Sequence, residues 1–312
     1  MAPTVDVVVT THEGWEFTRR CLEHLLEQTV AHTVIVSDGA STDGTPERIR
    51  ELFPDVVLLV HAEDPGYAAA TNTGVAAGSS DVVVLLNNDA FCRPDFIEHV
   101  ATAFDADERV GAVAPLTVRS DERTIDSVGL TLDVTLAPYI RLTGRPSEEA
   151  ASDSPLLVLP GGGADAYRRS AWTQAGGLDE QLAFYGADID LALRLHSLGW
   201  TTVAAPAAVA VHLRSATSGH RSRRARESGA WARGFLLRRW GVLRSRAFAR
   251  TLFTESLVSI SDMAISRDAV AVRSRVKGWK AAGGQPPRKV PPSAVDRNIG
   301  FVDSLRLRWA VR

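Results

Sequence analysis

The first part of the chain alternates short apolar runs with amphipathic segments. Four runs are rich in β-branched residues and most turn polar where they end: VDVVVTT (5–11), TVIVSDG (33–39), VVLLV (56–60) and VVVLLNND (82–89). Strands that are apolar along their whole length are typically buried on both faces, as in a parallel sheet. The pattern therefore predicts a parallel sheet with polar residues beyond its strand ends.

The segments between these runs have helical spacing. Residues 15–28 repeat apolar side chains every three or four positions, and in TPERIREL (45–52) Thr45 suits the cap and Pro46 the first turn. Strands that alternate with helices form βαβ units. We expect an α/β fold with a Rossmann-like, mostly parallel sheet flanked by helices, and ligands bind such sheets beyond the carboxyl ends of the strands.

The alternation weakens after residue 115. A polar, proline-containing stretch at 145–155 is typical of an exposed loop. Further on, TTVAA (201–205) and VAVHL (209–213) are expected to form two short strands. The chain beyond residue 219 is helical and basic until GGQPPRKVPPS (283–293) interrupts it. We expect one α/β domain over residues 1–218, in two halves that meet between 115 and 116. Residues 219–312 form a basic helical C-terminal extension.

Charge and cysteine content exclude some classes of protein. The net charge of −2 argues against a dedicated nucleic-acid binder. Cys21 and Cys92 are too few for a disulfide framework or a C-x-x-C metal site, which favours a reducing compartment. No run approaches 18 apolar residues, and no leader pattern begins the chain. We expect a cytoplasmic protein that is still able to touch a membrane surface.

Five segments carry a family resemblance. They are VVVTTHEGWEFTRRCLEHLLEQT (7–29), VSDGASTDGT (36–45), DPGYAAATNTGVAAGSSDVVVLLNNDA (64–90), PGGGADAYRRSAWTQAGGLDEQLAFYGADIDLALRLHSLGW (160–200) and PAAVAVHLRSATS (206–218). Each is weak alone, but their order and spacing resemble the family-2 glycosyltransferases, an inverting group with the GT-A fold. The resemblance runs from residue 5 to residue 218.

This resemblance implies a function. Residues 1–115 would be the nucleotide-binding half and residues 116–218 the acceptor and catalytic half. The reaction would transfer a sugar from a nucleoside-diphosphate sugar to an acceptor hydroxyl, which needs a cradle for the nucleoside, a cation for the diphosphate and a base for the hydroxyl. The resemblance includes bacterial rhamnosyl- and galactofuranosyltransferases of the cell envelope. It therefore implies a UDP- or dTDP-sugar donor and a glycan or lipid-linked acceptor, while the oligomeric state stays open.

Four residues at strand ends are candidates for the nucleoside. Asp38 ends the second apolar run, and its carboxylate can accept hydrogen bonds from the base and the ribose. The family comparison places Thr10, Thr11 and His12 in the same pocket. The alternative for Asp38 is a plain turn residue, because the DGASTDG segment forms a loop by its composition alone.

Four more residues are candidates near the donor. In DPGYAAATNTG these are Gly66 and Asn72, and after the fourth apolar run they are Asn87 and Asn88. The alternative for the first segment is a small-residue helix that packs closely on the sheet.

The family pattern implies a divalent cation, Mn²⁺ or Mg²⁺, at Asp89 and His212. The family commonly carries D-x-D where this chain has Asn87, Asn88 and Asp89, so its first aspartate is replaced by Asn87. A carboxylate with an imidazole suits Mn²⁺. The alternative for Asp89 is a helix cap or a turn former, and the alternative for His212 is an ordinary packed or solvated residue at a strand end.

Asp188 matches the general base of the family. It is the second member of an E-D pair in which Ala187 replaces the glutamate, so acceptor binding is more in doubt than the base. A carboxylate in the first turn of a helix is stabilised by the helix dipole, and we expect it to be ionised. The alternative is a plain cap. Asp190 and Arg194, spaced i,i+4, are predicted to form a structural pair.

The glycines of PGGGADAYRR are candidates for the acceptor or sugar region. Gly161, Gly162 and Gly163 let the backbone approach a ligand closely. The G-x-G-x-x-G spacing of a dinucleotide site fails here.

The basic extension suggests peripheral contact with the inner face of a membrane. Trp231, Phe235, Leu236, Trp240 and Leu243 share one side of a predicted helical segment with arginines around them. The alternative is that this aromatic face packs on the catalytic domain and the arginines are solvated.

Two other classes of protein are compatible with part of the pattern. The departures at Asn87 and Ala187 allow a nucleotide-sugar-binding protein without catalysis. A nucleotidyltransferase shares the α/β layout, but the Gly-rich, lysine-bearing phosphate loop it normally carries near the N-terminus is not visible.

Overall fold

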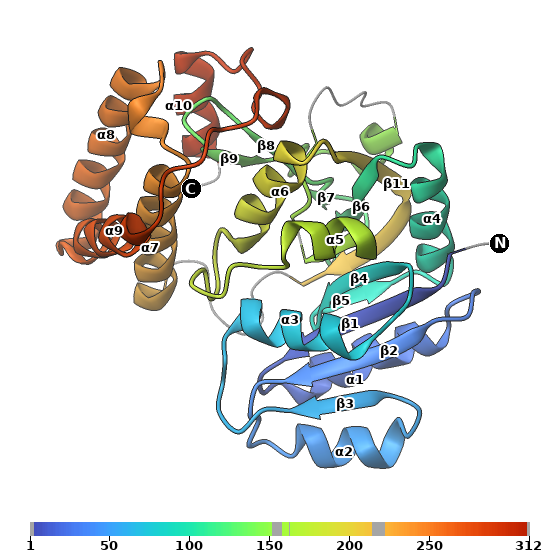
Figure 1. Ribbon diagram of the computed structural model, residues 1–312. Helices are drawn as coiled ribbons and strands as arrows, with labels where there is room; N and C mark the ends of the chain where they lie inside the picture. The colour runs from blue at the N-terminus through green and yellow to red at the C-terminus, as the bar shows by residue number, and fades with distance from the viewer. Residues whose placement is uncertain (1–2, 152–157, 162, 214–221, 311–312) are drawn as a thin grey trace. The chain divides into compact units, whose positions relative to one another are not determined.

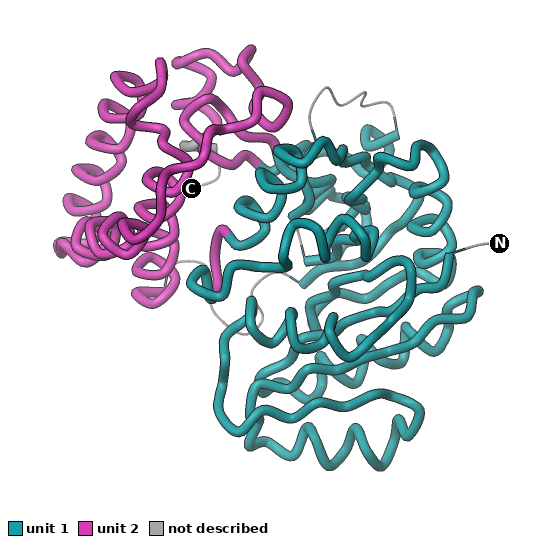
Figure 2. The backbone as a smooth tube through the Cα atoms, in the orientation of Figure 1, with its two compact units in different colours: residues 1–130, 140–183, 187–217 teal, residues 131–139, 184–186, 218–312 magenta. Residues whose placement is uncertain are grey.

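The computed structural model of the protein describes residues 3–151, 158–161, 163–213 and 222–310. The chain divides into two compact units (Figure 2). Unit 1 comprises residues 1–130, 140–183 and 187–217, and unit 2 comprises residues 131–139, 184–186 and 218–312. Unit 2 thus contains the predicted C-terminal extension and, in addition, two short segments, 131–139 and 184–186, which were not predicted to belong to it.

Unit 1 holds the alternating elements. In chain order the first half contains β1 (Val5–Thr11), α1 (Trp15–Leu26), β2 (Thr33–Asp38), α2 (Thr45–Leu52), β3 (Val57–Val60), α3 (Tyr67–Ala77), β4 (Val82–Asn87), β5 (Ala90–Cys92) and α4 (Phe96–Ala103). There follow η1 (Phe104–Ala106), β6 (Val110–Val118), β7 (Ile125–Ser127), η2 (Ser147–Ala151), β10 (Ala164–Arg168), α5 (Arg169–Ala175), α6 (Ala187–Ser197) and β11 (Thr201–His212). A two-stranded ribbon of β8 (Leu130–Leu132) and β9 (Pro138–Ile140) lies where the chain passes between the units.

Within the described residues the main sheet has nine strands, in the order β3-β2-β1-β4-β10-β6-β11-β5 with β7 beside β6 (Figure 1). Neighbours β1 and β2, β1 and β4, β2 and β3, and β6 and β11 run parallel, whereas β10, β5 and β7 pair antiparallel. The prediction of a mostly parallel sheet flanked by helices is confirmed.

The strand register gathers the polar strand ends at one edge. Thr10 lies opposite both Ser37 and Asn87, and Thr11 lies opposite Asp38. Strand order reverses between β1 and β4, and the crevice at such a point is where ligands bind an open α/β sheet.

Both faces of the central strands β1 and β4 are buried, which explains their continuous apolar runs, whereas the edge strand β3 is partly exposed. Val7 and Val9 belong to a core cluster with Cys21 and Leu22 of α1. Successive side chains of a strand point to opposite faces, and α3 covers the other face, where a Cβ on Gly74 would lie 2.4 Å from Cγ1 of Val8. Both cysteines are free and buried.

The end of unit 1 differs from the sequence-based prediction. TTVAA and VAVHL were expected as two short strands, but the structure has one strand, β11, whose register with β6 shifts between Ala205 and Val209. Pro206 cannot donate to the ladder, and a bulge accommodates it without ending the strand.

Unit 2 is helical. Its elements are α7 (Arg223–Arg239), η3 (Val242–Arg244), α8 (Phe248–Ser266), α9 (Val270–Ala281), η4 (Ala282–Gly284), η5 (Pro292–Ala294) and α10 (Phe301–Ala310). Helices α7 and α9 meet backbone to backbone, since a Cβ on Gly234 would lie 1.9 Å from the Arg275 carbonyl oxygen and one on Gly278 equally close to that of Trp231.

The side chains proposed as a membrane-facing surface are mostly inside the protein. Phe235, Leu236 and Trp240 are 1 to 3% exposed, and Trp231 stacks on Phe235. The prediction that this face contacts lipid is therefore wrong, because α7 packs closely against α9 and these side chains are buried. Among the described residues, no helix is both long enough and apolar enough to cross a bilayer.

Candidate active site

Strand pairing brings Asp89 and His212 together. β5 starts one residue after Asp89 and pairs with the end of β11, so that His212 lies opposite Ala90 and the Leu213 N–H donates to the Asp89 carbonyl. Nε2 of His212 lies 3.3 Å from Oδ1 of Asp89. Two residues 123 positions apart thus meet because β5 pairs antiparallel with the end of β11.

A second carboxylate, not identified from the sequence, orients the imidazole. Nδ1 of His212 lies 2.8 Å from Oδ2 of Asp126, in the short strand β7. Burial alone lowers the pKa of His212, but its hydrogen bonds to Asp126 and Asp89 outweigh this and raise the pKa to about 9. A carboxylate on Nδ1 leaves Nε2 directed at a ligand, as in the histidine ligands of metal sites. No motif or periodicity marks Asp126 in the sequence.

Asp188 lies in the first turn of α6. Burial raises the pKa of its carboxyl, while the backbone N–H groups of Ile189 and of Asp188 itself lower it. The expected stabilisation by the helix start is therefore present but opposed by desolvation. A raised pKa suits a group that must accept a proton.

Asp165 of β10 interacts electrostatically with both Asp188 and His212, and it was not identified from the sequence. Its Oδ1 accepts the Gly161 N–H at 2.7 Å. The pKa of Asp165 is raised to about 7, mainly by burial and also by the charge of Asp188, although the hydrogen bond from the Gly161 N–H and the charge of His212 lower it. Asp188 and His212 therefore belong to one electrostatic neighbourhood. Tyr67 of α3 shares it, because burial and then the charges of Asp165 and Asp188 raise its pKa.

The glycine segment runs past both sides of this cluster. A Cβ on Gly161 would lie 3.1 Å from Oδ2 of Asp188, and one on Gly163 would lie 2.9 Å from Nε2 of His212 and 3.0 Å from Nδ2 of Asn87. The Asn87 N–H also donates to the Gly163 carbonyl. Gly162 lies outside the described residues. Backbone without side chains here keeps open the space in front of Asp188 and His212.

Asp38 has an acceptor atom that the described protein does not use. The residue is fully buried at the end of β2; Oδ1 accepts the Ser41 N–H at 2.8 Å, and Oδ2 has no hydrogen-bond partner among the described residues. His12 lies close by, with Nδ1 2.7 Å from the Gly39 carbonyl oxygen. A buried carboxylate oxygen is costly unless something donates to it, which favours a ligand N–H or O–H at this point.

Thr11 and Asn88 are engaged within the protein. Their side chains form a buried network with Thr18: the two hydroxyls are 2.8 Å apart, and Nδ2 of Asn88 donates to both at 3.1 Å. The network ties β1, α1 and the β4 end together. Thr10 is half-buried and lies opposite Ser37 and Asn87 in the register.

The side chain of Asn72 is hydrogen-bonded within the protein. Its amide donates to the Leu178 carbonyl and to Glu180, and its Oδ1 accepts the Leu178 N–H at 2.9 Å. These bonds fasten α3 to the segment that leads to α6. Gly66 precedes α3 and packs against Ala183.

The predicted pair on α6 is confirmed. Nε of Arg194 donates to Oδ2 of Asp190 at 2.7 Å, and both side chains are buried. The pair fixes the helix whose first turn carries Asp188.

Similar solved structures show which fold the chain has. A mannosyltransferase from Pyrobaculum calidifontis, solved with GDP-Man and Mn²⁺, matches 100% of this chain and 81% of its own, with a TM-score of 0.56 at 21% identity. GalNAc-T7, solved with UDP, GalNAc and Mn²⁺, matches 77% of this chain and 48% of its own, with a TM-score of 0.58 at 15% identity. The fold is that of the GT-A glycosyltransferases.

The family follows from the sequence match. The chain belongs to glycosyltransferase family 2, whose family model, described as Glycosyl transferase family 2, matches residues 6–172. The chain is therefore a glycosyltransferase, and the family assignment favours this class over both alternatives raised from the sequence.

Curated relatives point in the same direction. N-acetylglucosaminyl-diphospho-decaprenol L-rhamnosyltransferase of Mycobacterium tuberculosis is 29% identical over 243 residues, which are 70% of this chain and 79% of that protein. Pre-mycofactocin glycosyltransferase of the same organism is 28% identical over 213 residues, 67% of this chain and 42% of that protein.

Proposed function

We propose that this protein is a metal-dependent inverting glycosyltransferase that transfers a sugar from a nucleoside-diphosphate sugar to an acceptor hydroxyl. The observation that carries the proposal is the meeting of Asp89 and His212 at 3.3 Å, with Asp188 across the same glycine segment. In this proposal, Asp89 and His212 on one side of the segment act on the departing diphosphate, and Asp188 on the other side acts on the incoming hydroxyl.

The residues present fit a divalent cation. Among the described residues no three His, Cys, Asp or Glu side chains are grouped as ligands of one ion, but Asp89 with Nε2 of His212 gives a carboxylate and an imidazole. We assign these two as ligands of Mn²⁺ or Mg²⁺, with the donor diphosphate completing the shell. Such a cation would stabilise the charge that develops on the leaving diphosphate. Asp126 holds the imidazole in the orientation that this requires.

Asp188 takes the proton. Its carboxylate accepts the acceptor hydroxyl proton as the oxygen attacks the anomeric carbon from the face opposite the diphosphate. A single displacement of this kind inverts the anomeric centre. The raised pKa of Asp188, caused by burial, makes it a stronger base than an exposed aspartate.

Asp38 receives the nucleoside. Oδ2, which lacks a partner among the described residues, would accept from the base N–H or a ribose hydroxyl. We propose a UDP- or dTDP-sugar as the donor and a lipid-linked glycan as the acceptor, in bacterial cell-envelope synthesis at the inner face of the membrane. The support is the 29% identical relative, whose name specifies a decaprenol-linked acceptor.

Replacement of Asp188 by Asn tests the mechanism. Asp188→Asn keeps the shape of the side chain but cannot accept the proton, so transfer falls about 10²- to 10⁴-fold. The donor Kd, measured by calorimetry with Mn²⁺, stays within about threefold of the parent, because Asp188 faces the acceptor. Asp105→Asn, an exposed carboxylate in the same unit, is the control and keeps full activity. Unchanged turnover in Asp188→Asn, or donor binding by the parent without hydrolysis or transfer, contradicts the proposal.

A further inference from the structure

Helix α8 turns its apolar side chains outward. All ten of its exposed residues are uncharged, and nine of them are apolar: Phe248, Ala249, Leu252, Phe253, Ser256, Leu257, Ile260, Met263, Ala264 and Ile265. Ile265 is 74% exposed and Ile260 59%. A helix on a water-facing surface normally shows the opposite pattern, with the apolar stripe inside.

The charged residues of α8 face inward and are paired there. Arg250 donates to Asp133 at 2.9 Å, and Asp133 is fully buried. Glu255 is buried and accepts from Arg233.

The third charge on α8 follows the same pattern, since Asp262 binds Arg226 at 2.9 Å. With all three charges of the helix held by partners in its own unit, its outward face is apolar from end to end. Ion pairs rather than apolar packing fix this orientation.

The apolar surface continues onto α10. The rings of Phe253 and Phe301 are 5.7 Å apart, and Val302 beside Phe301 is 55% exposed. Contiguous apolar surface of this kind marks a site of interaction, because isolated exposed residues are ordinary but a continuous face is not.

Charge indicates what covers this face. Residues 219–312 contain 21 Lys and Arg but only 6 Asp and Glu, although the whole chain has a net charge of −2. Exposed Arg244 and Arg246 lie just before α8, and exposed Arg267 follows it directly. Cations thus stand at both ends of the apolar helix.

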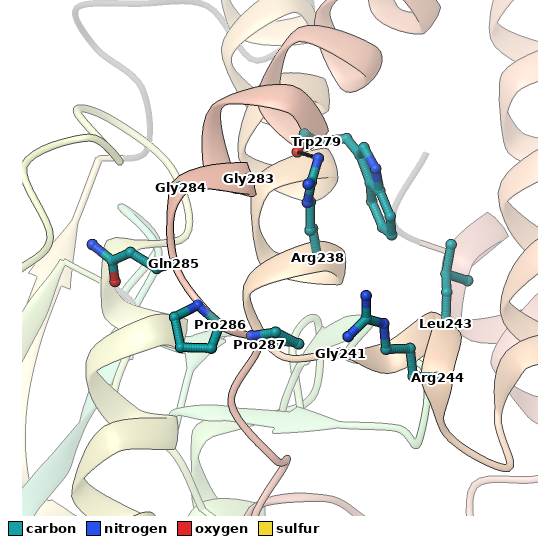
Figure 3. A pocket seen from close by; sticks show the side chains of 10 residues that line it. All are labelled: Arg238, Gly241, Leu243, Arg244, Trp279, Gly283, Gly284, Gln285, Pro286 and Pro287. Atoms are coloured by element: carbon teal, nitrogen blue, oxygen red, sulfur yellow. Dashed lines mark hydrogen bonds between the residues drawn. The ribbon is translucent and has the colours of Figure 1, made fainter.

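A recess beside the start of α8 adds to the cationic character. A cavity of about 410 Å³ opens in unit 2, lined by Arg238, Leu243, Arg244, Trp279, Gln285 and several glycine and proline residues (Figure 3). Arg244 belongs to η3, which packs against α8. A phosphate group near α8 would therefore meet guanidinium groups.

We propose that the outward face of α8, with Phe301 and Val302 of α10, lies in the interface of an anionic phospholipid membrane, with the surrounding arginines on the headgroups. Apolar burial and attraction to acidic lipids act together in such binding. The surface differs from the one expected on α7, and the inference does not depend on which sugar the enzyme transfers.

Vesicle flotation of the full chain tests the inference. We expect the parent to float with vesicles of phosphatidylcholine and phosphatidylglycerol and to stay at the bottom with phosphatidylcholine alone. Phe253→Asp with Ile260→Asp removes two large apolar anchors and lowers the partition coefficient at least tenfold. The matched control is Leu26→Asp with Leu52→Asp, which alters two exposed apolar residues of unit 1 and leaves partition unchanged. All four positions are exposed, so each variant is expected to fold, and circular dichroism checks this.

A second pair of variants examines the charges. Arg244→Glu with Arg246→Glu, and separately 0.5 M salt, each lower partition several-fold, since interfacial arginines contribute about 1 kcal/mol each. Equal binding to neutral vesicles, or equal partition of the α8 variant and its control, overturns the proposal. A third outcome also overturns the proposal. If no vesicle binding occurs, and light scattering shows that the parent is a dimer and the α8 variant a monomer, then a second copy of the chain covers this face.

Discussion

Nδ1 of His212 lies 2.8 Å from Oδ2 of Asp126. The two residues are 86 positions apart, and they meet because β7 and β11 both pair with β6. This contact decides which imidazole nitrogen faces the proposed cation. With the Nδ1 proton held by Asp126, Nε2 is directed toward Asp89 and the space beside Gly163.

The contact predicts that Asp126→Asn weakens Mn²⁺ binding. The Asn carbonyl still accepts the Nδ1 proton, but the negative charge that strengthens the imidazole as a ligand is gone. We expect the Kd for Mn²⁺, measured by calorimetry with nucleoside diphosphate present, to rise about 10- to 100-fold. Glu122→Gln removes an exposed carboxylate four residues away and serves as the control. Equal Mn²⁺ affinity of the two variants would show that Asp126 does not act through His212.

The parallel half of the fold could be predicted from the sequence because its signals are local. A strand that is buried on both faces has a continuous apolar run in the sequence, and the helix after it has its own apolar periodicity. Ser37, Asp38 and Asn87 were placed at one edge simply because parallel strands end together. The interruption by Pro206 misled the reading of β11, since a bulge that absorbs a proline depends on β6 alongside it.

The parts of the site that could not be predicted depend on distant contacts. Asp126 lies in a three-residue strand, too short for any periodicity, and Asp165 gains its significance only from Gly161 and Asp188. Asn72, expected at the ligand, is bonded to the backbone of Leu178, a partner 106 residues away. The orientation of α8 could not be predicted either, because the partners of its charged residues come from α7 and from the segment around Asp133.

Gly163 is predicted to tolerate no side chain, for reasons of space as well as of backbone. Its φ is +89°, and Gly199 has a φ of +87° with no atom within 4 Å of the position of its missing Cβ. Gly163→Ala and Gly199→Ala therefore carry similar backbone strain of about 1 to 2 kcal/mol. Only Gly163→Ala pushes a methyl group against His212 and Asn87. We expect a loss of Tm by calorimetry in both variants, at least as large in Gly163→Ala, and a loss of transfer of at least about tenfold in Gly163→Ala alone. Equal activities would show that this space is not needed.

Asp38→Asn is predicted to weaken donor binding without harming the fold. The Asn carbonyl can keep the Ser41 N–H bond, whereas an NH₂ group replaces Oδ2, the atom without a partner among the described residues. A ligand donor then meets another donor. Since a hydrogen bond to a charged group contributes about 1.5 to 3 kcal/mol, the Kd for UDP or dTDP rises about 10- to 100-fold in calorimetry. Asp55→Asn, exposed at the surface, leaves the Kd unchanged. A Kd that does not move in Asp38→Asn removes this residue from the donor site.

Asp165→Asn is predicted to stabilise the protein at alkaline pH. Burial, with the charge of Asp188, raises the pKa of Asp165 in the folded state to about 7, against an ordinary value of 3.8. Between these values the folded state binds more protons than the unfolded state, so the free energy of unfolding falls as pH rises through this window, and the penalty is complete above about pH 7. Asn cannot ionise, and its carbonyl still accepts the Gly161 N–H. In urea titrations without metal, the free energy of unfolding of the variant should equal that of the parent near pH 4. At pH 8 it should exceed that of the parent by a few kcal/mol, which is the order of magnitude that linkage gives. Asp107→Asn, at an exposed position, should follow the parent at both pH values. A constant difference between Asp165→Asn and the parent across this range would mean that Asp165 does not carry a buried proton, and that its carboxylate is ionised beside Asp188 throughout.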